Sequence, residues 1–567
     1  MTDTPADTPA DLVFRGGRIH TVDDARPTAE AVAVQAGRIV AVGDESEIKP
    51  WIGSDTRIVD LRGGLLVPGF QDAHVHPLHG GIGRLRCNLH DSPGRAGVLD
   101  TIRRYAAEHP DLPWILGAGW YMSDFPGGTP TREELDIVVP DRPAFLTNRD
   151  GHGAWANSRA LELAGVDKDT SDPADGRIER RPDGTPSGTL HEGAMDLVER
   201  HAPVPGPDDW AAALRIGQAY LHSLGITAWQ DAIITPEDQR TYLGAVERGE
   251  LTARVEGALW WERDRGGEQV EELIQRSAAV KSAVGPGAGA GSGPNAGRFR
   301  ANSVKIMQDG VLENFTGALV EPYLDGHGGS TDRSGISFVD PAALRDHVRR
   351  LDAAGLQVHF HTIGDRAVRE ALDAIEAART ANGMTDTRPH LSHIQVIQPS
   401  DVPRFASLGA VANAQPYWAC HEGQMDDLTI PFLGPERTTW QYPFKSLLRS
   451  GARLAMGSDW SVSTPNPLLE MEVAVTRVAD ISRGRYEPFL PDERLTLEES
   501  MAAFTLGSAY VNHLDDVTGS IEVGKLADLT VIDRDLFAPD AGPIGDGRVL
   551  ATFVEGQPVY ESDGLRS

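Results

Sequence analysis

Cysteine is scarce in this chain of 567 residues, which contains only Cys87 and Cys420, far apart in the sequence. Small secreted domains stabilised by disulfides carry several cysteines at short spacings. Neither that pattern nor a Cys-x-x-Cys pair occurs here, so a disulfide framework is excluded. The low cysteine content favours a reducing cytoplasm.

Basic residues and long apolar runs are also in short supply. Lys and Arg number 53 against 83 Asp and Glu, which gives a net charge of -30. A chain this acidic offers little basic surface to phosphates, which excludes nucleic acid as a partner. No uncharged apolar run reaches the length of a membrane span, and residues 1–11 lack the basic and apolar regions of an export signal. We therefore expect a cytoplasmic protein that acts on a small molecule and binds neither nucleic acid nor membrane.

Both ends of the chain are rich in short strands separated by glycine-containing turns. Neither end has enough strands to cover its own apolar face. We therefore predict that residues 1–64 and 517–567 together form one small β-sandwich-like domain.

Between the two ends, short apolar strands alternate with helical patterns, which is typical of parallel βα units. The expected strands are residues 65–76, 225–231, 254–261, 303–307, 357–361, 390–395, 410–415 and 453–459. Eight such units predict an α/β fold, a (β/α)8 TIM barrel within residues 65–516. Residues 99–205 are too long for a βα loop and predict an inserted lobe over the barrel mouth. The glycine-rich residues 285–297 predict a mobile segment.

The sharpest local signal is the sequence PGFQDAHVHP at residues 68–77. Residues two apart in a strand face the same way, so His74 and His76 present two imidazoles on one side, and Pro77 ends the strand. Such a pair can bind one metal ion. An isolated His-x-His also occurs on ordinary polar strand faces, so further ligands are needed to support a metal site.

Four further candidates stand at or near the ends of other predicted strands, and the strand ends of a barrel converge on one mouth. They are Lys305, His361, His393 and Asp459. A lysine within an apolar strand is costly unless it is paired or modified, so Lys305 is either paired with an acid such as Asp309 or modified. His359 faces the same side as His361, and the spacing alone does not separate the two.

The stretches around these candidates resemble the amidohydrolase superfamily, and more closely the YtcJ-like amidohydrolase family 3, which includes N-substituted formamide deformylases. The matching stretches are VPGFQDAHVHP, NRDGHGAWANSRAL, VKIMQDG, HTIGDRAV, SHIQVIQP, GSDWSV with NPLLEM, and GSIEVGKLADLTVID. They run over nearly the whole chain. The resemblance implies the same barrel and composite β-domain, a homodimer, and hydrolysis of a C–N bond.

By this resemblance, His74, His76 and Asp459 hold one divalent ion, zinc in the first instance, with manganese or iron as alternatives. His361 and His393 complete that site or hold a second ion, which Lys305 bridges if CO2 carboxylates its amine. The catalytic residues are then Asp459, Lys305 and His393. Zinc lowers the pKa of bound water to about 7, and Asp459 would pass the released proton to the departing amine. The family motif His-x-Ile-Gly-Asp places the ligand at His361 rather than at His359.

Five residues are candidates for substrate contact, namely His152, Trp120, Asp124, Asp309 and Glu192. His152 matches a family position, whereas an aromatic such as Trp120 in the lobe is more often core than pocket wall. Glu192 can equally be a charge at a helix start. Asp72 is either a partner that orients the histidines or an ordinary polar strand residue. Residues 308–317 depart from the Ser-Arg-Thr-Ala type stretch of many relatives, and we expect this loop to line the pocket.

The predicted function is metal-dependent hydrolysis of a non-peptide amide in a small molecule, with an N-substituted formamide as the specific substrate. The first alternative is ester, lactone, carbamate or cyclic-imide hydrolysis at the same site. An alternative of another class is a binding or regulatory barrel without turnover. The presence of all six candidate ligands counts against a barrel without turnover.

Overall fold

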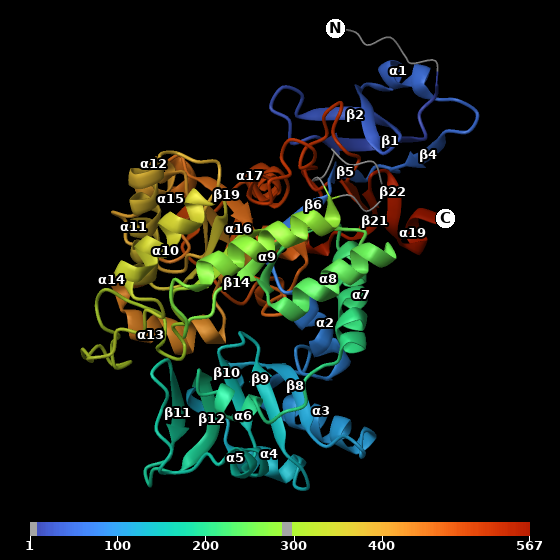
Figure 1. Cartoon of the computed structure of the whole chain (residues 1–567). Coiled ribbons are helices and arrows are strands. Elements are labelled where there is room, and N and C mark those ends of the chain that lie inside the picture. Colours follow the sequence, from blue (N-terminus) through green and yellow to red (C-terminus); the bar gives the residue numbers. More distant parts are fainter. Residues whose placement is uncertain (1–7, 286–296, 567) are drawn as a thin grey trace.

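The computed structural model describes residues 8–285 and 297–566, which form three sheets (Figure 1). The central sheet has eight parallel strands in the order β19-β18-β17-β16-β15-β14-β13-β6. Their bounds are β6 (Phe70–Val75), β13 (Ile226–Ile234), β14 (Arg254–Trp260), β15 (Phe299–Met307), β16 (Gln357–Thr362), β17 (His390–His393), β18 (Val411–Ala414) and β19 (Arg453–Met456). Each expected barrel strand is therefore present. Most of the glycine-rich segment that was expected to be mobile, residues 286–296, lies outside the described residues.

The barrel closes between β6 and the segment that follows β19. Asp459 N donates to His74 O at 2.8 Å, and His76 N donates to Trp460 O at 2.8 Å. The Asn413 side chain on β18 also donates to Ala73 O at 2.9 Å. Because all eight strands run parallel around a nearly closed ring, their carboxyl ends share one mouth. The predicted (β/α)8 fold is confirmed.

Helices follow most of the barrel strands and cover the outside of the sheet (Figure 1). They include α7 (Pro207–Ser223), α8 (Pro236–Arg248), α9 (Gln269–Val284), α10 (Pro341–Ala353), α11 (Asp365–Asn382) and α16 (Pro467–Thr476). The helix α10 shows why they form: the Asp340 side chain accepts from the first free backbone amides, and Pro341 occupies the first turn. Leu344, Val348 and Leu351 then recur on one face, which is buried.

Both chain ends contribute to a second sheet, with the order β22-β21-β20-β5-β1-β2-β3 and β4 paired with β1. The bounds are β1 (Leu12–His20), β2 (Thr28–Gln35), β3 (Arg38–Gly43), β4 (Arg57–Asp60), β5 (Leu65–Pro68), β20 (Leu529–Ile532), β21 (Val549–Val554) and β22 (Gln557–Glu561). The single strand expected over residues 65–76 is thus two strands, because β5 pairs with β20 and β6 joins the barrel. Gly69 joins them, and a Cβ there would lie 2.5 Å from the Thr227 side chain, so only glycine fits.

The third sheet belongs to a lobe that lies on the opposite side of the barrel from the chain-end sheet (Figure 1). Its order is β11-β12-β10-β9-β8-β7. The bounds are β7 (Cys87–Asn88), β8 (Ile115–Trp120), β9 (Ala144–Asn148), β10 (Gly153–Ala156), β11 (Gly176–Arg180) and β12 (Pro186–Glu192). The lobe sheet therefore starts at Cys87, earlier than the expected residue 99.

No helix in the described part of the chain has both the length and the apolar character required to cross a bilayer.

Candidate metal centre

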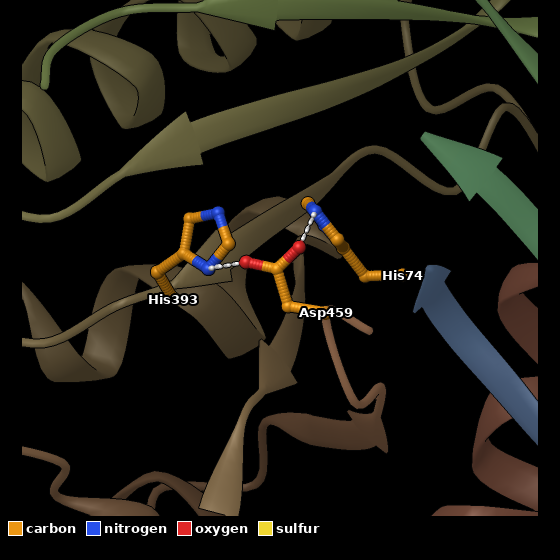
Figure 2. Close-up of side chains that lie close together, drawn as sticks. All are labelled: His74, His393 and Asp459. Atoms are coloured by element: carbon orange, nitrogen blue, oxygen red, sulfur yellow. Dashed lines mark ion pairs between the residues drawn. The ribbon is translucent and has the colours of Figure 1, made fainter. Parts of the chain in front are cut away.

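Three side chains from three strand ends meet at the barrel mouth (Figure 2). His74 lies on β6, His393 ends β17, and Asp459 follows β19. Each offers one ligand atom, and these atoms all lie within 4.8 Å of one another. The Asp459 carboxylate lies between the two rings, with Oδ1 3.3 Å from His74 Nε2 and Oδ2 3.8 Å from His393 Nδ1. His393 and Asp459 have φ values of 73° and 55°, a left-handed conformation that is costly for these residues and concentrates at functional sites.

The other three predicted ligands border this group. His76 Nε2 lies 3.0 Å from Asp459 Oδ1, and Lys305 Nζ lies 3.5 Å from His74 Nε2. The ring of His361 lies 4.4 Å from that of His393, measured between centroids. The structure therefore brings all six residues together, although they are spread from position 74 to position 459.

Burial sets the protonation state of this group. Loss of solvent, helped by the positive charge of Lys305, holds the pKa of His74 well below its usual value. Burial and neighbouring imidazoles do the same for His361 and His393. Burial also lowers the pKa of Lys305 to about 7. Burial alone would raise the pKa of Asp459, but His76, His393 and Lys305 together outweigh it and lower that pKa. Neutral imidazoles and an ionised carboxylate are the forms that bind a metal ion.

Several buried polar atoms of the group lack a hydrogen bond of ordinary geometry within the described part of the chain. They are His76 Nδ1, His393 Nδ1 and Asp459 Oδ1. A buried polar atom without a partner costs about 1–3 kcal/mol. One or two divalent ions would satisfy imidazole nitrogens and carboxylate oxygens at once. The donor set therefore fits a metal ion.

Asp309 occupies a different position from the one expected. It is fully buried, and His361 Nδ1 lies 3.2 Å from its Oδ1. Its two oxygens also accept from the backbone amides of Ala318, Ile363 and Gly364 at 2.8–3.0 Å. The predicted substrate contact and the alternative pairing with Lys305 are both wrong, because these bonds use the carboxylate. Asp309 instead orients the ring of His361.

His359 and Ser392 hold the opposite edge of His74. His359 Nε2 lies 2.8 Å from His74 Nδ1 and 2.8 Å from Ser392 Oγ, and Ser392 Oγ lies 2.9 Å from His74 Nδ1. His359 and His361 share one side of β16, but His359 lies deeper in the barrel. Asp72 supports the same strand end, since it accepts from Ser458 N and Oγ and from His74 N. Ser392 was missed in the sequence, where its place directly before His393 was the only signal.

The lobe contributes a charged pair beside His361. His152 Nδ1 lies 2.8 Å from Glu192 Oε1, and the His152 ring lies 5.3 Å from the ring of His361. Burial opposes a charge on His152, but Glu192, helped by Asp150 and Asp459, outweighs it and raises the pKa of His152 to about 9. Burial likewise opposes the charge on Glu192, and His152 with Arg263 lowers the pKa of this acid to about 2. His152 is therefore an imidazolium at neutral pH.

The remaining two substrate candidates lie away from the histidines. Trp120 is buried in the lobe core, where its Nε1 donates to Leu146 O at 2.8 Å and its ring packs against Phe125 and Trp155. The predicted substrate contact is wrong for Trp120, because its polar atom and its faces are used within the lobe. Asp124 ends the short helix η2 (Met122–Asp124) and is half-buried, near the pocket but not among the described residues that line it.

A pocket with about 640 Å³ of empty space, part of it open to solvent, adjoins the metal group. Its lining includes four aromatic residues, Tyr121, Tyr417, Trp418 and Tyr442, and three acids, Asp150, Glu313 and Glu422. The Trp418 ring stacks on His393 at 5.2 Å between centroids. Val311 and Glu313 come from the loop at residues 308–317, as expected. The segment after β18 was missed as pocket lining, although its place after a predicted strand end was a usable signal.

Known proteins resemble this chain over nearly its full length. The amidohydrolase family model matches residues 57–560. Protein LONG AFTER FAR-RED 3 of Arabidopsis thaliana is 31% identical, over 98% of this chain and 92% of that protein. An N-substituted formamide deformylase of Arthrobacter pascens is 29% identical, over 98% and 99% of the two chains. The crystal structure of an uncharacterised metal-dependent hydrolase from Pyrococcus furiosus superimposes with a TM-score of 0.68 at 25% identity, over 92% and 99%. The chain therefore belongs to the amidohydrolase family and is a metal-dependent hydrolytic enzyme.

Proposed function

We propose that this enzyme hydrolyses the amide bond of a small molecule, and that the substrate is an N-substituted formamide. The approach of the ligand atoms of His74, His393 and Asp459 to within 4.8 Å carries the proposal. The likeness to a protein named N-substituted formamide deformylase supports the choice of bond.

The metal ion is zinc in this proposal, held by His74, His76 and Asp459. His361, His393 and a carboxylated Lys305 complete the site or hold a second ion. When bound, the ion polarises the amide carbonyl and makes water acidic enough to attack at neutral pH. A carbonyl group bound at these residues would lie beside the Asp459 carboxylate.

Asp459 and His152 perform the proton transfer and the charge stabilisation. Asp459 accepts a proton from the attacking water and delivers it to the departing nitrogen, so that the C–N bond breaks as an acid and an amine are formed. The charged His152 donates a hydrogen bond from Nε2 to the amide oxygen, on which negative charge develops. Glu192 keeps His152 protonated through the contact at Nδ1.

A panel of N-alkyl formamides and formate esters with the same alkyl groups tests the bond that is cleaved. We expect formate release from the amides to exceed that from the esters, relative to the uncatalysed rates. Turnover of the esters alone would overturn the amide proposal and favour the esterase alternative.

The role of the site is tested by Asp459→Asn, which retains the shape of the side chain but removes the base. We expect kcat to fall by about 10²–10⁴-fold, with an unchanged circular dichroism spectrum. Asp55→Asn is the matched control, because Asp55 is exposed in the chain-end sheet region. We also expect a chelator to abolish activity and zinc, manganese or iron to restore it. Full activity of Asp459→Asn would contradict the assignment.

A further inference from the structure

The pocket beside the metal group contains more negative than positive side chains. Asp150, Glu313 and Glu422 line it together with a single cation, Arg149. Arg149 already donates to backbone oxygens, from Nε to Val462 O at 2.6 Å and from a terminal nitrogen to His90 O at 3.2 Å. The guanidinium therefore makes its hydrogen bonds to the backbone and none to the pocket carboxyls, although its charge opposes the burial that raises the pKa of Glu422, and the charge of His152 does the same for Asp150.

The three carboxyls differ in how well they are satisfied. Asp150 accepts from His152 N at 2.9 Å, and Glu313 accepts from Thr429 Oγ1 at 3.0 Å. No hydrogen bond or ion pair joins the Glu422 carboxyl to any residue that the structure describes. Glu422 is thus a pocket carboxyl that only a ligand or solvent can satisfy.

A second unpartnered group independently points to a ligand. Tyr442 is only 2% exposed and lines the same pocket, yet its hydroxyl has no hydrogen bond within the described part of the chain. Burial raises the pKa of this hydroxyl, and the nearby charges of Glu313 and Glu422 raise it further. Because no atom of the described residues bonds this hydroxyl, its partner comes from the pocket, either as a ligand or as water.

The aromatic walls suit the same kind of ligand. The rings of Tyr121, Tyr417 and Trp418 also line the pocket. Aromatic faces attract cations, and the attraction grows when solvent is excluded. Burial raises the pKa of Glu313 to about 7 and that of Glu422 to about 6, so both acids gain from a neighbouring positive charge.

We propose that this pocket binds the protonated amine of a substrate whose amide bond lies at the metal group. The inference rests on the proposed amide hydrolysis. The two regions are continuous, because Trp418 stacks on His393 and Val462 N donates to Asp459 O at 2.7 Å. A formyl group carries no amine, so the amine belongs to the substituent on nitrogen. The substrate class is a diamine that carries one formyl group.

Two formamides of equal length test this pocket, N-(4-aminobutyl)formamide and N-pentylformamide, which differ by an ammonium in place of a methyl group. We expect kcat/KM of the zinc-loaded enzyme to be about tenfold higher for the aminobutyl compound, mainly through KM. An equal or reversed preference in the wild type overturns the inference and leaves amide hydrolysis standing.

Matched variants locate the preference within the pocket. We expect Glu422→Gln to reduce the ratio of the two kcat/KM values toward one. Asp427→Asn removes the same charge from an exposed position on η5 (Gln424–Thr429), and we expect it to retain the preference. If Glu422→Gln fails to fold, Glu313→Gln provides the same test. A preference that survives in the pocket variant contradicts the assignment.

Equilibrium binding separates this inference from the proposed function. If neither formamide is hydrolysed, the proposed function fails, and calorimetry of both compounds with the zinc-loaded enzyme still tests the pocket. Tighter binding of the aminobutyl compound, lost in Glu422→Gln, supports the cation site. Equal binding overturns it.

Discussion

Burial lowers the pKa of the Lys305 amine to about 7, so that the neutral amine is far more populated at neutral pH than in an ordinary lysine. Only the neutral amine attacks CO2, and the product is a carbamate with loss of one proton. We therefore predict a carbamate signal by ¹³C NMR after incubation with ¹³C-bicarbonate, and its absence in Lys305→Ala. Because the neutral form increases as pH rises through about 7, the signal should grow over that range. An identical signal in wild type and Lys305→Ala would contradict carboxylation at this site.

The charged pair of His152 and Glu192 predicts a basic limit to activity. The pKa of His152 is raised to about 9, so the stabilisation by its charge is complete below its ordinary pKa and is lost as pH rises through about 9. We expect kcat/KM to fall over the same range. Glu192→Gln should shift this fall in kcat/KM to lower pH, because the carboxylate that stabilises the proton on His152 is gone. A pH–rate profile between 6 and 10 checks both statements. If kcat/KM of Glu192→Gln falls at the same pH as in the wild type, His152 is not the group that causes the fall.

The six residues that we propose as metal ligands could be identified singly from the sequence, whereas the roles of their neighbours could not. His74, His76, Lys305, His361, His393 and Asp459 stand in motifs at predicted strand ends. Asp309 also stands in a motif at a predicted strand end. Its carboxylate faces His361 because three backbone amides from two loops donate to it. Such a choice depends on loop packing, which has no local sequence signal.

The strand β16 places two histidines at two depths, and each has a different task. His359 and Ser392 contact His74 Nδ1 and leave Nε2 directed toward Asp459. We predict that His359→Asn weakens zinc affinity about 10–100-fold without loss of the fold. Competition with a chromogenic chelator measures this, with His109→Asn on the exposed end of α3 (Gly94–Glu108) as the control. Unchanged affinity in His359→Asn would assign this histidine to the barrel core alone.

The barrel strands were predictable because each is a short apolar run with turn residues at its ends. The run at residues 65–76 was the difficult case, since it was expected to be one strand and yet supplies two sheets. Its division at Gly69 depends on β20, more than 450 positions later in the chain, which pairs with β5. Strand propensity is therefore informative about where a strand is and less informative about its partner.

A buried ion pair joins the barrel to the chain-end sheet. Arg254 on β14 pairs with Asp528 and Glu555, and both Arg254 and Asp528 are buried. We predict that Arg254→Met lowers the free energy of unfolding by about 3–5 kcal/mol, because Asp528 is left buried without its main cation. Urea denaturation measures this. Arg103→Met, which breaks only an exposed pair with Asp100, should have little effect. A small loss in Arg254→Met would mean that the sheet is held to the barrel by apolar packing.

The assembly and the location of the enzyme stay predictions. The resemblance implies a homodimer, which sedimentation analysis can test.

The alternation of strands and helices, the strand-end ligands and the family were determined by the sequence itself, because periodicity and motifs are local properties. The tertiary structure alone decided that Trp120 lies in the lobe core, that Asp309 orients His361, and that Asp150, Glu313 and Glu422 share a pocket. The reason is physical: these outcomes depend on contacts between residues of different strands, helices and loops. Such contacts exist only after these elements have packed in the folded protein.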